Sequence, residues 1–278
     1  VNTYASPNAE IKGNIAVKFR QEAPKPVKLL PGVKNIIGVS SGKGGVGKST
    51  VASNLAVALA AQGYKVGLLD ADIFGPSAPK MFGVEDEPVY MDEVEGRHLI
   101  APVEKYGVKI LSIGFLVEKD SAVLWRGGMA SNALKQLISD ANWGELDYFV
   151  IDMPPGTSDI HLTLVQTLAI TGAIVVTTPQ EVALADARKG ISMFQSDKVN
   201  VPVLGIVENM SYFTCPDCGC EIKVFGDSHV EEIATTYGIP LLARLPIDPA
   251  AAAACDNGKV ESIDTAPIQP ALDKILSL

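Results

Sequence analysis

Residues 42–50 read Gly-Lys-Gly-Gly-Val-Gly-Lys-Ser-Thr, and this stretch decides the fold. It fits the pattern G-x-x-x-x-G-K-[ST], whose glycines let backbone N–H groups converge on phosphate oxygens. An apolar run at 36–39 precedes it and a helical pattern at 50–62 follows it. The stretch therefore opens a helix, and a helix N-terminus favours an anion. We predict a phosphate-binding loop; the alternative is a glycine-rich turn that only joins strand to helix.

The loop also predicts how a nucleotide would be held. The Lys48 side chain should hold the β- and γ-phosphates, and the Ser49 hydroxyl should ligate Mg²⁺. The remaining phosphate contacts are expected from the loop backbone and the first helical turn, at Gly44, Gly45, Val46, Gly47 and Thr50.

Strand-like runs recur along the chain, and a helical pattern follows each of them. The runs are rich in Val, Ile and Leu and are apolar on both faces, as in a parallel sheet that helices cover on both sides. The sequence therefore predicts an α/β fold: a doubly wound, mostly parallel sheet with helices on both faces. The predicted strands are 35–40, 65–69, 109–113, 148–151, 172–177, 203–207 and 241–245.

Composition limits the class of protein. With 278 residues, 47% of them hydrophobic, the chain can bury the core of one large globular domain, predicted at 33–278 with the phosphate loop inside it. Residues 1–32 contain four prolines and are expected to form an N-terminal extension with one strand at 15–19. The net charge of −9 and the lack of a long apolar run predict no nucleic-acid and no membrane partner. We expect a cytoplasmic location; because the first residue is Val, a missing targeting segment and an organellar matrix stay open.

Two predicted strands end in carboxylates. Asp70 and Asp72 follow the second strand, at the carboxyl edge of the sheet, where open α/β folds bind ligands. Asp152 ends an apolar strand, like the acid that holds Mg²⁺, directly or through water, in P-loop proteins. The N–H of Gly156 is a candidate sensor of the γ-phosphate. Asp70 has a second interpretation, as a structural carboxylate that caps its loop.

Lys43 is a second cation in the loop, five residues before Lys48. The pattern K-G-G-x-G-K-[ST] resembles the deviant Walker A motif of the MinD/Mrp/ParA group of ATPases. The resemblance implies that Lys43 reaches the nucleotide of a partner subunit and acts in catalysis there, so that hydrolysis needs a homodimer. It also implies that Asp72 positions the attacking water and that Asn209 binds adenine. The alternatives are a solvated loop lysine and an asparagine that caps the next turn.

Three of the four cysteines crowd into residues 215–220. The C-x-x-C spacing lets Cys215 and Cys218 face one metal centre, but one such pair supplies only half of a four-thiolate site. A homodimer would supply the other half through a two-fold axis. Cys220 is expected to point away from the pair, and Cys255 to be a small buried or surface residue. The predicted metal-binding loop lies near 211–226.

Six short motifs stand along the chain: Gly75-Pro76-Ser77, Trp125-Arg126-Gly127, Asp152-Met153-Pro154-Pro155-Gly156-Thr157, Thr178-Pro179-Gln180, Glu208-Asn209-Met210 and the C-P-x-C. Together they resemble the Mrp/ApbC family of iron–sulfur cluster carriers over about residues 33–276. The resemblance implies a homodimeric ATPase with ATP, Mg²⁺ and a [4Fe–4S] cluster, which it transfers to apo iron–sulfur proteins, with cluster scaffold proteins as further partners.

The cysteine spacing leaves a second class of protein open. Spacing alone does not separate iron from zinc, so the alternative is a MinD- or ParA-like positioning switch with a structural zinc. Such a switch would use a basic amphipathic tail or a basic surface to bind membrane or DNA. The last nine residues contain a single cation, which favours the carrier.

Overall fold

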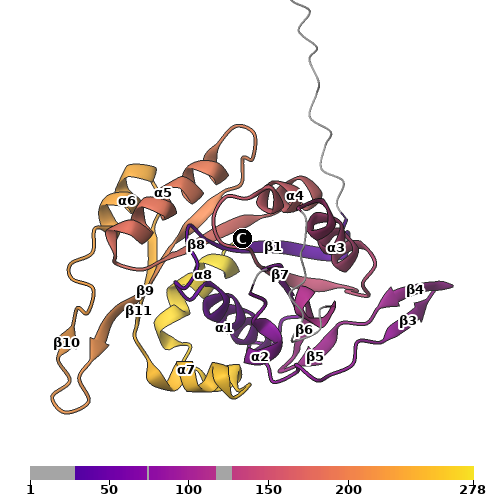
Figure 1. Ribbon diagram of the computed structural model, residues 1–278, viewed down its shortest axis with the longest axis horizontal. Helices are drawn as coiled ribbons and strands as arrows, with labels where there is room; N and C mark the ends of the chain where they lie inside the picture. Colours follow the sequence, from indigo (N-terminus) through magenta and orange to yellow (C-terminus); the bar gives the residue numbers. More distant parts are fainter. Residues whose placement is uncertain (1–28, 74, 117–126) are drawn as a thin grey trace, which may run out of the picture.

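A central sheet of nine strands organises the computed structural model, which describes residues 29–73, 75–116 and 127–278 (Figure 1). The strands are β1 (Val33–Ser41), β2 (Val66–Asp70), β5 (Val103–Lys105), β6 (Val108–Ser112), β7 (Leu146–Asp152), β8 (Gly172–Thr177), β9 (Val203–Thr214), β10 (Glu221–Ile222) and β11 (Leu241–Pro246). Their order is β10-β9-β8-β1-β7-β2-β6-β5, with β11 beside β9. All seven strands predicted after residue 32 are confirmed. The strand expected at 15–19 and the motif residues Trp125 and Arg126 lie outside the described residues.

The centre of the sheet is parallel, as predicted. β1 pairs in parallel with β7 and β8, β2 with β6 and β7, and β9 with β8 and β11. The edge strands β5 and β10 are antiparallel to their neighbours. The sequence did not predict these two, nor the separate hairpin of β3 (Met91–Val94) and β4 (Arg97–Ile100). Strands of two to four residues offer too few alternating positions to stand out.

Helices cover both faces of the sheet, as predicted. One face packs against α1 (Lys48–Ala61), α2 (Ala78–Met81) and α8 (Gln269–Leu276). The other packs against α3 (Gly127–Ser139), α4 (Asp159–Thr167), α5 (Glu181–Gln195) and α6 (Val230–Tyr237). Successive strand residues alternate between the two cores, as Leu68 and Leu69 of β2 do. The described chain also contains α7 (Pro249–Asp256) and the short 3-10 helices η1 (Ile113–Leu116), η2 (Val260–Ser262) and η3 (Ala266–Ile268).

The carboxyl ends of four parallel strands meet at one edge of the sheet. Asp70 of β2 and Val39 of β1 both pair in register with Asp152 of β7, which lies between them. β1 continues into the phosphate loop and α1. β9 is twelve residues long and runs on past Glu208, the last of its residues that pairs with β8, before the chain turns into β10 (Figure 1). This edge therefore joins the phosphate loop, the acidic strand ends and the strand that leads to the cysteines.

Candidate functional site

The phosphate loop, residues 42–47, is shaped by its glycines. Gly45 and Gly47 have φ angles of +79° and +84°, in the left-handed region that glycine adopts without strain. A side chain built on Gly44 or Gly45 would meet nothing within 4 Å, so this part of the loop borders open space. α1 begins at Lys48, two residues earlier than predicted. The first N–H groups of a helix have no partner inside it, so this helix start suits the phosphate site that the sequence predicts.

Lys48 is buried at the centre of the site. Its Nζ lies 2.5 Å from Oδ1 of Asp152, 3.4 Å from Oδ2 of Asp72 and 3.2 Å from Oγ of Ser49. One ammonium therefore faces two carboxylates from the ends of two different strands and stabilises both, because buried carboxylates need a partner. The structure thus brings together four of the predicted site residues.

Asp152 has the features of a magnesium-binding carboxylate. Burial raises its pKa, and the ammonium of Lys48 opposes that rise. Its Oδ1 accepts the hydrogen bond from Lys48, whereas its Oδ2 is buried and has no hydrogen-bond partner among the described residues. Buried acceptors are nearly always satisfied, and Mg²⁺ takes oxygen ligands. The orphaned oxygen therefore fits Mg²⁺, with the hydroxyl of Ser49 as a second ligand.

Asp70 is a structural carboxylate, the second of its two predicted interpretations. Its oxygens accept hydrogen bonds from four groups: the backbone N–H groups of Asp72, Ser77 and Ala78 and the hydroxyl of Ser112. Burial, and then a neighbouring carboxylate, raise the pKa of Asp70 to about 7. Asp70 therefore fixes the loop that carries Asp72 beside the buried lysine.

Gly156 lies next to the phosphate loop, but its N–H is occupied. It donates a 2.8 Å hydrogen bond to the carbonyl of Ser41, the last residue of β1. Gly156 has a φ of +82° and open surroundings, so its peptide has room to turn. Its role as a sensor of the γ-phosphate stays a prediction, and that role requires the bond to Ser41 to break.

Asn209 lines a cavity beside the loop. Its Nδ2 donates a 3.0 Å hydrogen bond to the carbonyl of Val46, so the amide binds the phosphate loop rather than its own next turn. The cavity has a volume of about 140 Å³, and Thr50 and Leu245 also line it. The sequence did not point to Asn54, which lines the cavity one turn after Thr50 on α1. The predicted adenine contact therefore has a cavity of suitable position next to it.

Lys43 stands at the exposed tip of the loop. The hydroxyl of Ser41 donates a 2.9 Å hydrogen bond to the backbone carbonyl of Lys43 and fixes the backbone there. Within residues 29–73, 75–116 and 127–278, its ammonium has no hydrogen-bond or ion-pair partner. The side chain is thus available to a group outside the chain, as its predicted role requires.

His161 of α4 is a buried neighbour of the site. Its Nε2 lies 3.4 Å from Oγ of Ser40 and its Nδ1 lies 3.5 Å from Oγ of Ser158. Burial, and then the charge of Lys48, lower its pKa to about 4. The imidazole is therefore neutral near pH 7, and it supports the end of β1 beneath the phosphate loop.

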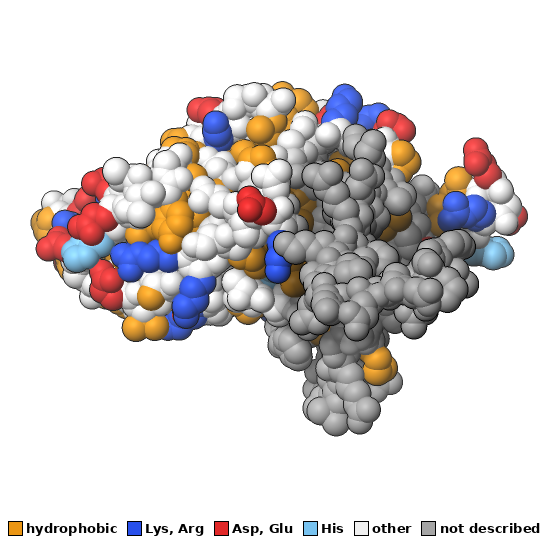
Figure 2. All heavy atoms as spheres, turned by 90° about the horizontal axis from the view of Figure 1, so that it is seen from above, with side chains coloured by type: hydrophobic (Ala, Val, Ile, Leu, Met, Phe, Trp, Pro, Cys, Tyr) orange, Lys and Arg blue, Asp and Glu red, His pale blue; other side chains and the backbone are white. Residues whose placement is uncertain are grey.

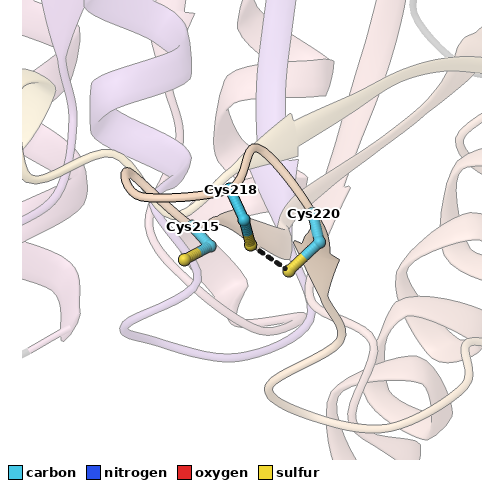
Figure 3. Close-up of side chains that lie close together, drawn as sticks. All are labelled: Cys215, Cys218 and Cys220. Atoms are coloured by element: carbon cyan, nitrogen blue, oxygen red, sulfur yellow. Dashed lines mark hydrogen bonds between the residues drawn. The ribbon is translucent and has the colours of Figure 1, made fainter.

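Three cysteines converge in the turn between β9 and β10, with Cys218 drawn between Cys215 and Cys220 (Figure 3). Their Sγ atoms all lie within 4.8 Å of one another, and those of Cys218 and Cys220 are 3.2 Å apart. The expectation that Cys220 points away is wrong. Gly219 has a φ of +72°, and the N–H of Cys215 donates to the carbonyl of Cys220, so the turn closes and returns Cys220 to the pair. Cys255, in contrast, is buried in α7.

The cysteine turn is open to solvent, and it favours the thiolate form of Cys218 over that of Cys220. Cys218 and Cys220 are exposed, and Cys215 is half-buried. The backbone N–H of Cys220, and then its thiol, lower the pKa of Cys218, whereas Cys218 raises the pKa of Cys220. Cys218 therefore ionises before Cys220. The thiolate is the form that binds metals.

Glu208 is a buried carboxylate next to Asn209, and it holds both ends of residues 211–228, which we call the cysteine hairpin. Its Oε2 accepts a 2.5 Å hydrogen bond from Oγ of Ser211, and its Oε1 accepts one from Oγ of Ser228. Nε of Arg244 on β11 lies 3.4 Å from the carboxylate. The sequence gave Glu208 no role, because two of its partners are distant in sequence.

The fold and the phosphate loop together define a class: α/β proteins with a P-loop for nucleotide phosphates. Within that class, residues 32–277 match the ParA family model, which is described as NUBPL iron-transfer P-loop NTPase. The chain belongs to this family. The resemblance to iron–sulfur cluster carriers that its motifs indicated is therefore confirmed.

Curated relatives agree with this assignment. The iron–sulfur cluster carrier protein of Aquifex aeolicus (strain VF5) is 54% identical over 233 residues, which are 84% of this chain and 63% of that protein. The protein of the same name from Pseudomonas fragi is 50% identical over 242 residues, which are 87% of this chain and 83% of that protein. The chain spans about three fifths of the length of several such relatives, the Aquifex protein among them.

Solved structures confirm the fold. A nucleotide-binding protein from Archaeoglobus fulgidus, in complex with ADP and with cobalt found in it, is 40% identical, with a TM-score of 0.73 over 84% of this chain and 90% of that one. The cell division ATPase MinD of Pyrococcus furiosus is 24% identical, with a TM-score of 0.61 over 87% of this chain and 98% of that one. The second likeness shows the fold alone, and it matches the doubly wound, MinD-like architecture that the sequence predicted.

Proposed function

We propose that the chain is an ATP-hydrolysing iron–sulfur cluster carrier: a homodimer that binds a [4Fe–4S] cluster between its subunits and transfers it to apo-proteins. One observation carries the proposal. The sulfurs of Cys215 and Cys218 converge on an exposed turn, and the strand that leads to this turn also carries Asn209 at the nucleotide cavity. The family membership of the chain, and the names of its relatives, support the iron–sulfur cargo.

The nucleotide half of the proposal rests on the contacts of Lys48. A bound ATP would draw this ammonium toward its phosphates and away from the carboxylates of Asp72 and Asp152. Mg²⁺, held by Ser49 and Asp152, would neutralise charge on the phosphate oxygens. Asp72, released from the lysine, would then be free to orient the attacking water.

The dimer would complete both sites. Lys43 lies exposed at the tip of the loop, so it is available to stabilise the transferred phosphoryl group of a partner subunit. Cys215 and Cys218 of each chain would supply four thiolates when a two-fold axis brings the two turns together. A cluster held there would be within reach of solvent, as cargo must be if a scaffold protein is to load it and an apo-protein is to receive it.

Surface charge favours the carrier over a positioning switch that binds membrane or DNA. On the face in Figure 2, acidic, apolar and other side chains lie around the Lys and Arg side chains. The net charge of the chain is −9. Binding to an anionic polymer or surface relies on clustered cations. Among the described helices, none combines the length and the apolar character that crossing a bilayer requires.

Anaerobic reconstitution with iron and sulfide tests the cargo. The parent should bind the iron and sulfide of one [4Fe–4S] cluster per two chains, and it should pass the cluster to an apo-protein. The variant Cys215→Ala/Cys218→Ala should bind none, whereas Cys255→Ala, at a buried cysteine outside the turn, should match the parent. Equal iron in parent and double variant, or zinc retained in preference to iron, would defeat the proposal; the second result would favour the positioning switch.

Phosphate release from Mg-ATP tests the enzymatic half. Lys48→Ala and Asp72→Asn should each abolish release, because both side chains face the place of the reacting phosphate. Hydrolysis at the parent rate by either variant would show that the assigned site is not the catalytic one.

A further inference from the structure

Cys220 adds a third sulfur to a site for which the family pattern needs two. We propose that Cys215, Cys218 and Cys220 of a single chain form a three-thiolate site for one soft divalent metal ion, with its fourth coordination position open. The inference rests on the proposed function for two of its ligands and adds the third from the structure. No partner subunit is needed for this site.

The distances between the sulfurs fit a tetrahedral metal. A metal–sulfur bond of about 2.3 Å places two sulfurs of a tetrahedron about 3.8 Å apart. The three Sγ atoms lie within 4.8 Å of one another, and one pair is 3.2 Å apart. Each sulfur therefore needs to move by about an ångström or less to come within bonding distance of one shared metal position. Rotation about χ1 supplies such shifts without a change of backbone.

The backbone of the turn holds the three sulfurs close before any metal binds. The N–H of Cys215 donates to the carbonyl of Cys220, and the N–H of Gly219 donates to the carbonyl of Cys215, both at 2.9 Å. The left-handed φ of Gly219 lets the chain reverse between the second and third cysteine. A ligand set that the backbone has already arranged loses little conformational entropy when it binds.

The open position gives Cys220 a role in handing over cargo. A thiolate of a recipient can donate a lone pair to the metal at that position, and the bond from the metal to Cys220 can then break, so that Cys220 leaves as a thiolate. One bond forms, one breaks, and no electrons are transferred to or from the metal. In the proposed dimer the same residue would be a spare ligand next to the bridging pair, exposed to the incoming molecule.

Anaerobic titration of the full chain with Co²⁺ tests the inference. The parent should bind one ion per chain with a thiolate-to-cobalt charge-transfer band. Cys220→Ser should lower the intensity of this band by about one third, since one of three thiolates is lost. The affinity should fall by more than about tenfold, since even an outer-shell partner contributes that much. Cys255→Ser, at the buried cysteine of α7, is the matched control and should titrate like the parent.

Thiol alkylation of the parent, read by mass spectrometry, gives a measurement without any substitution. Cobalt should protect Cys215, Cys218 and Cys220 together. If Cys220 is alkylated equally with and without cobalt, and Cys220→Ser binds like the parent while Cys215→Ser does not, this inference is overturned and the two-cysteine proposal stands. If Cys215→Ser and Cys218→Ser also bind cobalt like the parent, both the inference and the proposed metal site are overturned.

Discussion

Replacing Gly47 by alanine tests how the phosphate loop and Asn209 fit together. At a φ of +84°, a residue with a side chain loses roughly 1–2 kcal/mol to backbone strain. A Cβ on Gly47 would also lie 2.1 Å from Nδ2 of Asn209. The amide must then swing away and break its bond to Val46, which contributes about 0.5–1.5 kcal/mol. We expect Gly47→Ala to lower the free energy of unfolding by about 2–3 kcal/mol.

Two neighbouring glycines separate these effects. Gly45 has a similar φ of +79° but open surroundings, so Gly45→Ala should lose only the strain part, roughly 1–2 kcal/mol. Gly44 has no positive φ, and a Cβ added to it would meet nothing within 4 Å. The free energy of unfolding of Gly44→Ala should therefore stay within about 0.5 kcal/mol of the parent's. The measurement is urea unfolding without nucleotide, because a bound nucleotide would add stability of its own.

The variant Asn209→Ala completes a double-mutant cycle with Gly47→Ala. Once the amide is gone, the new methyl group meets no obstacle. The loss of stability in the double variant should therefore be smaller than the sum of the single losses by about 1 kcal/mol. Equal losses for Gly45→Ala and Gly47→Ala, together with no coupling in the cycle, would refute the contact between Asn209 and the loop.

Four further perturbations address the rest of the site. Lys43→Ala should slow phosphate release by at least about a thousandfold and leave urea unfolding unchanged, because its ammonium is exposed; release at the parent rate would exclude a role in trans. Burial raises the pKa of Asp70 to about 7, so stability should fall as pH rises from about 4 to 7, and Asp70→Asn should remove that fall. Burial lowers the pKa of His161 to about 4, so stability should fall as pH drops from about 6.5 to 4, and His161→Gln should remove that loss; unfolding curves with the parent's pH slope would contradict either assignment. Glu208→Gln should speed hydrogen exchange across residues 211–228 severalfold, and unchanged exchange would show that the carboxylate does not hold the hairpin.

Most of the fold could be predicted because its signals are local. The phosphate loop, the buried runs before it and after it, and the order of strand and helix all follow from neighbours in the sequence. The two-residue strand β10 and the start of α1 could not be predicted in the same way. Pairing with β9 defines the first, and helix boundaries are set by hydrogen bonds rather than by residue type alone.

The candidate site, too, could be predicted where its contacts follow from the order of the strands, but not where they depend on the backbone conformation of a turn. That Lys48, Asp72 and Asp152 lie together follows from the rule that parallel strands end at one edge of a sheet. The position of Cys220 does not follow from spacing, because the left-handed turn at Gly219 reverses the direction that an extended C-x-C would give. The sign of φ at a glycine cannot be read from the residue itself, since glycine adopts both.

Glu208 and Asn209 connect the two sites through adjacent residues of one strand. Asn209 binds the loop at Val46, Glu208 binds both ends of the cysteine hairpin, and Met210 next to them has a φ of +56°, which costs energy for a residue with a side chain. In the proposed function, a nucleotide base that drew Asn209 off the loop would therefore move a segment that also fixes the hairpin. One hydrogen bond of about 1 kcal/mol and strain of roughly 1–2 kcal/mol limit the coupling to about 2–3 kcal/mol, or roughly 30- to 150-fold in metal affinity. In the proposed function, coupling of this size would let ATP bias the binding of a cluster, whereas complete transfer would still need the competing thiolates of a recipient.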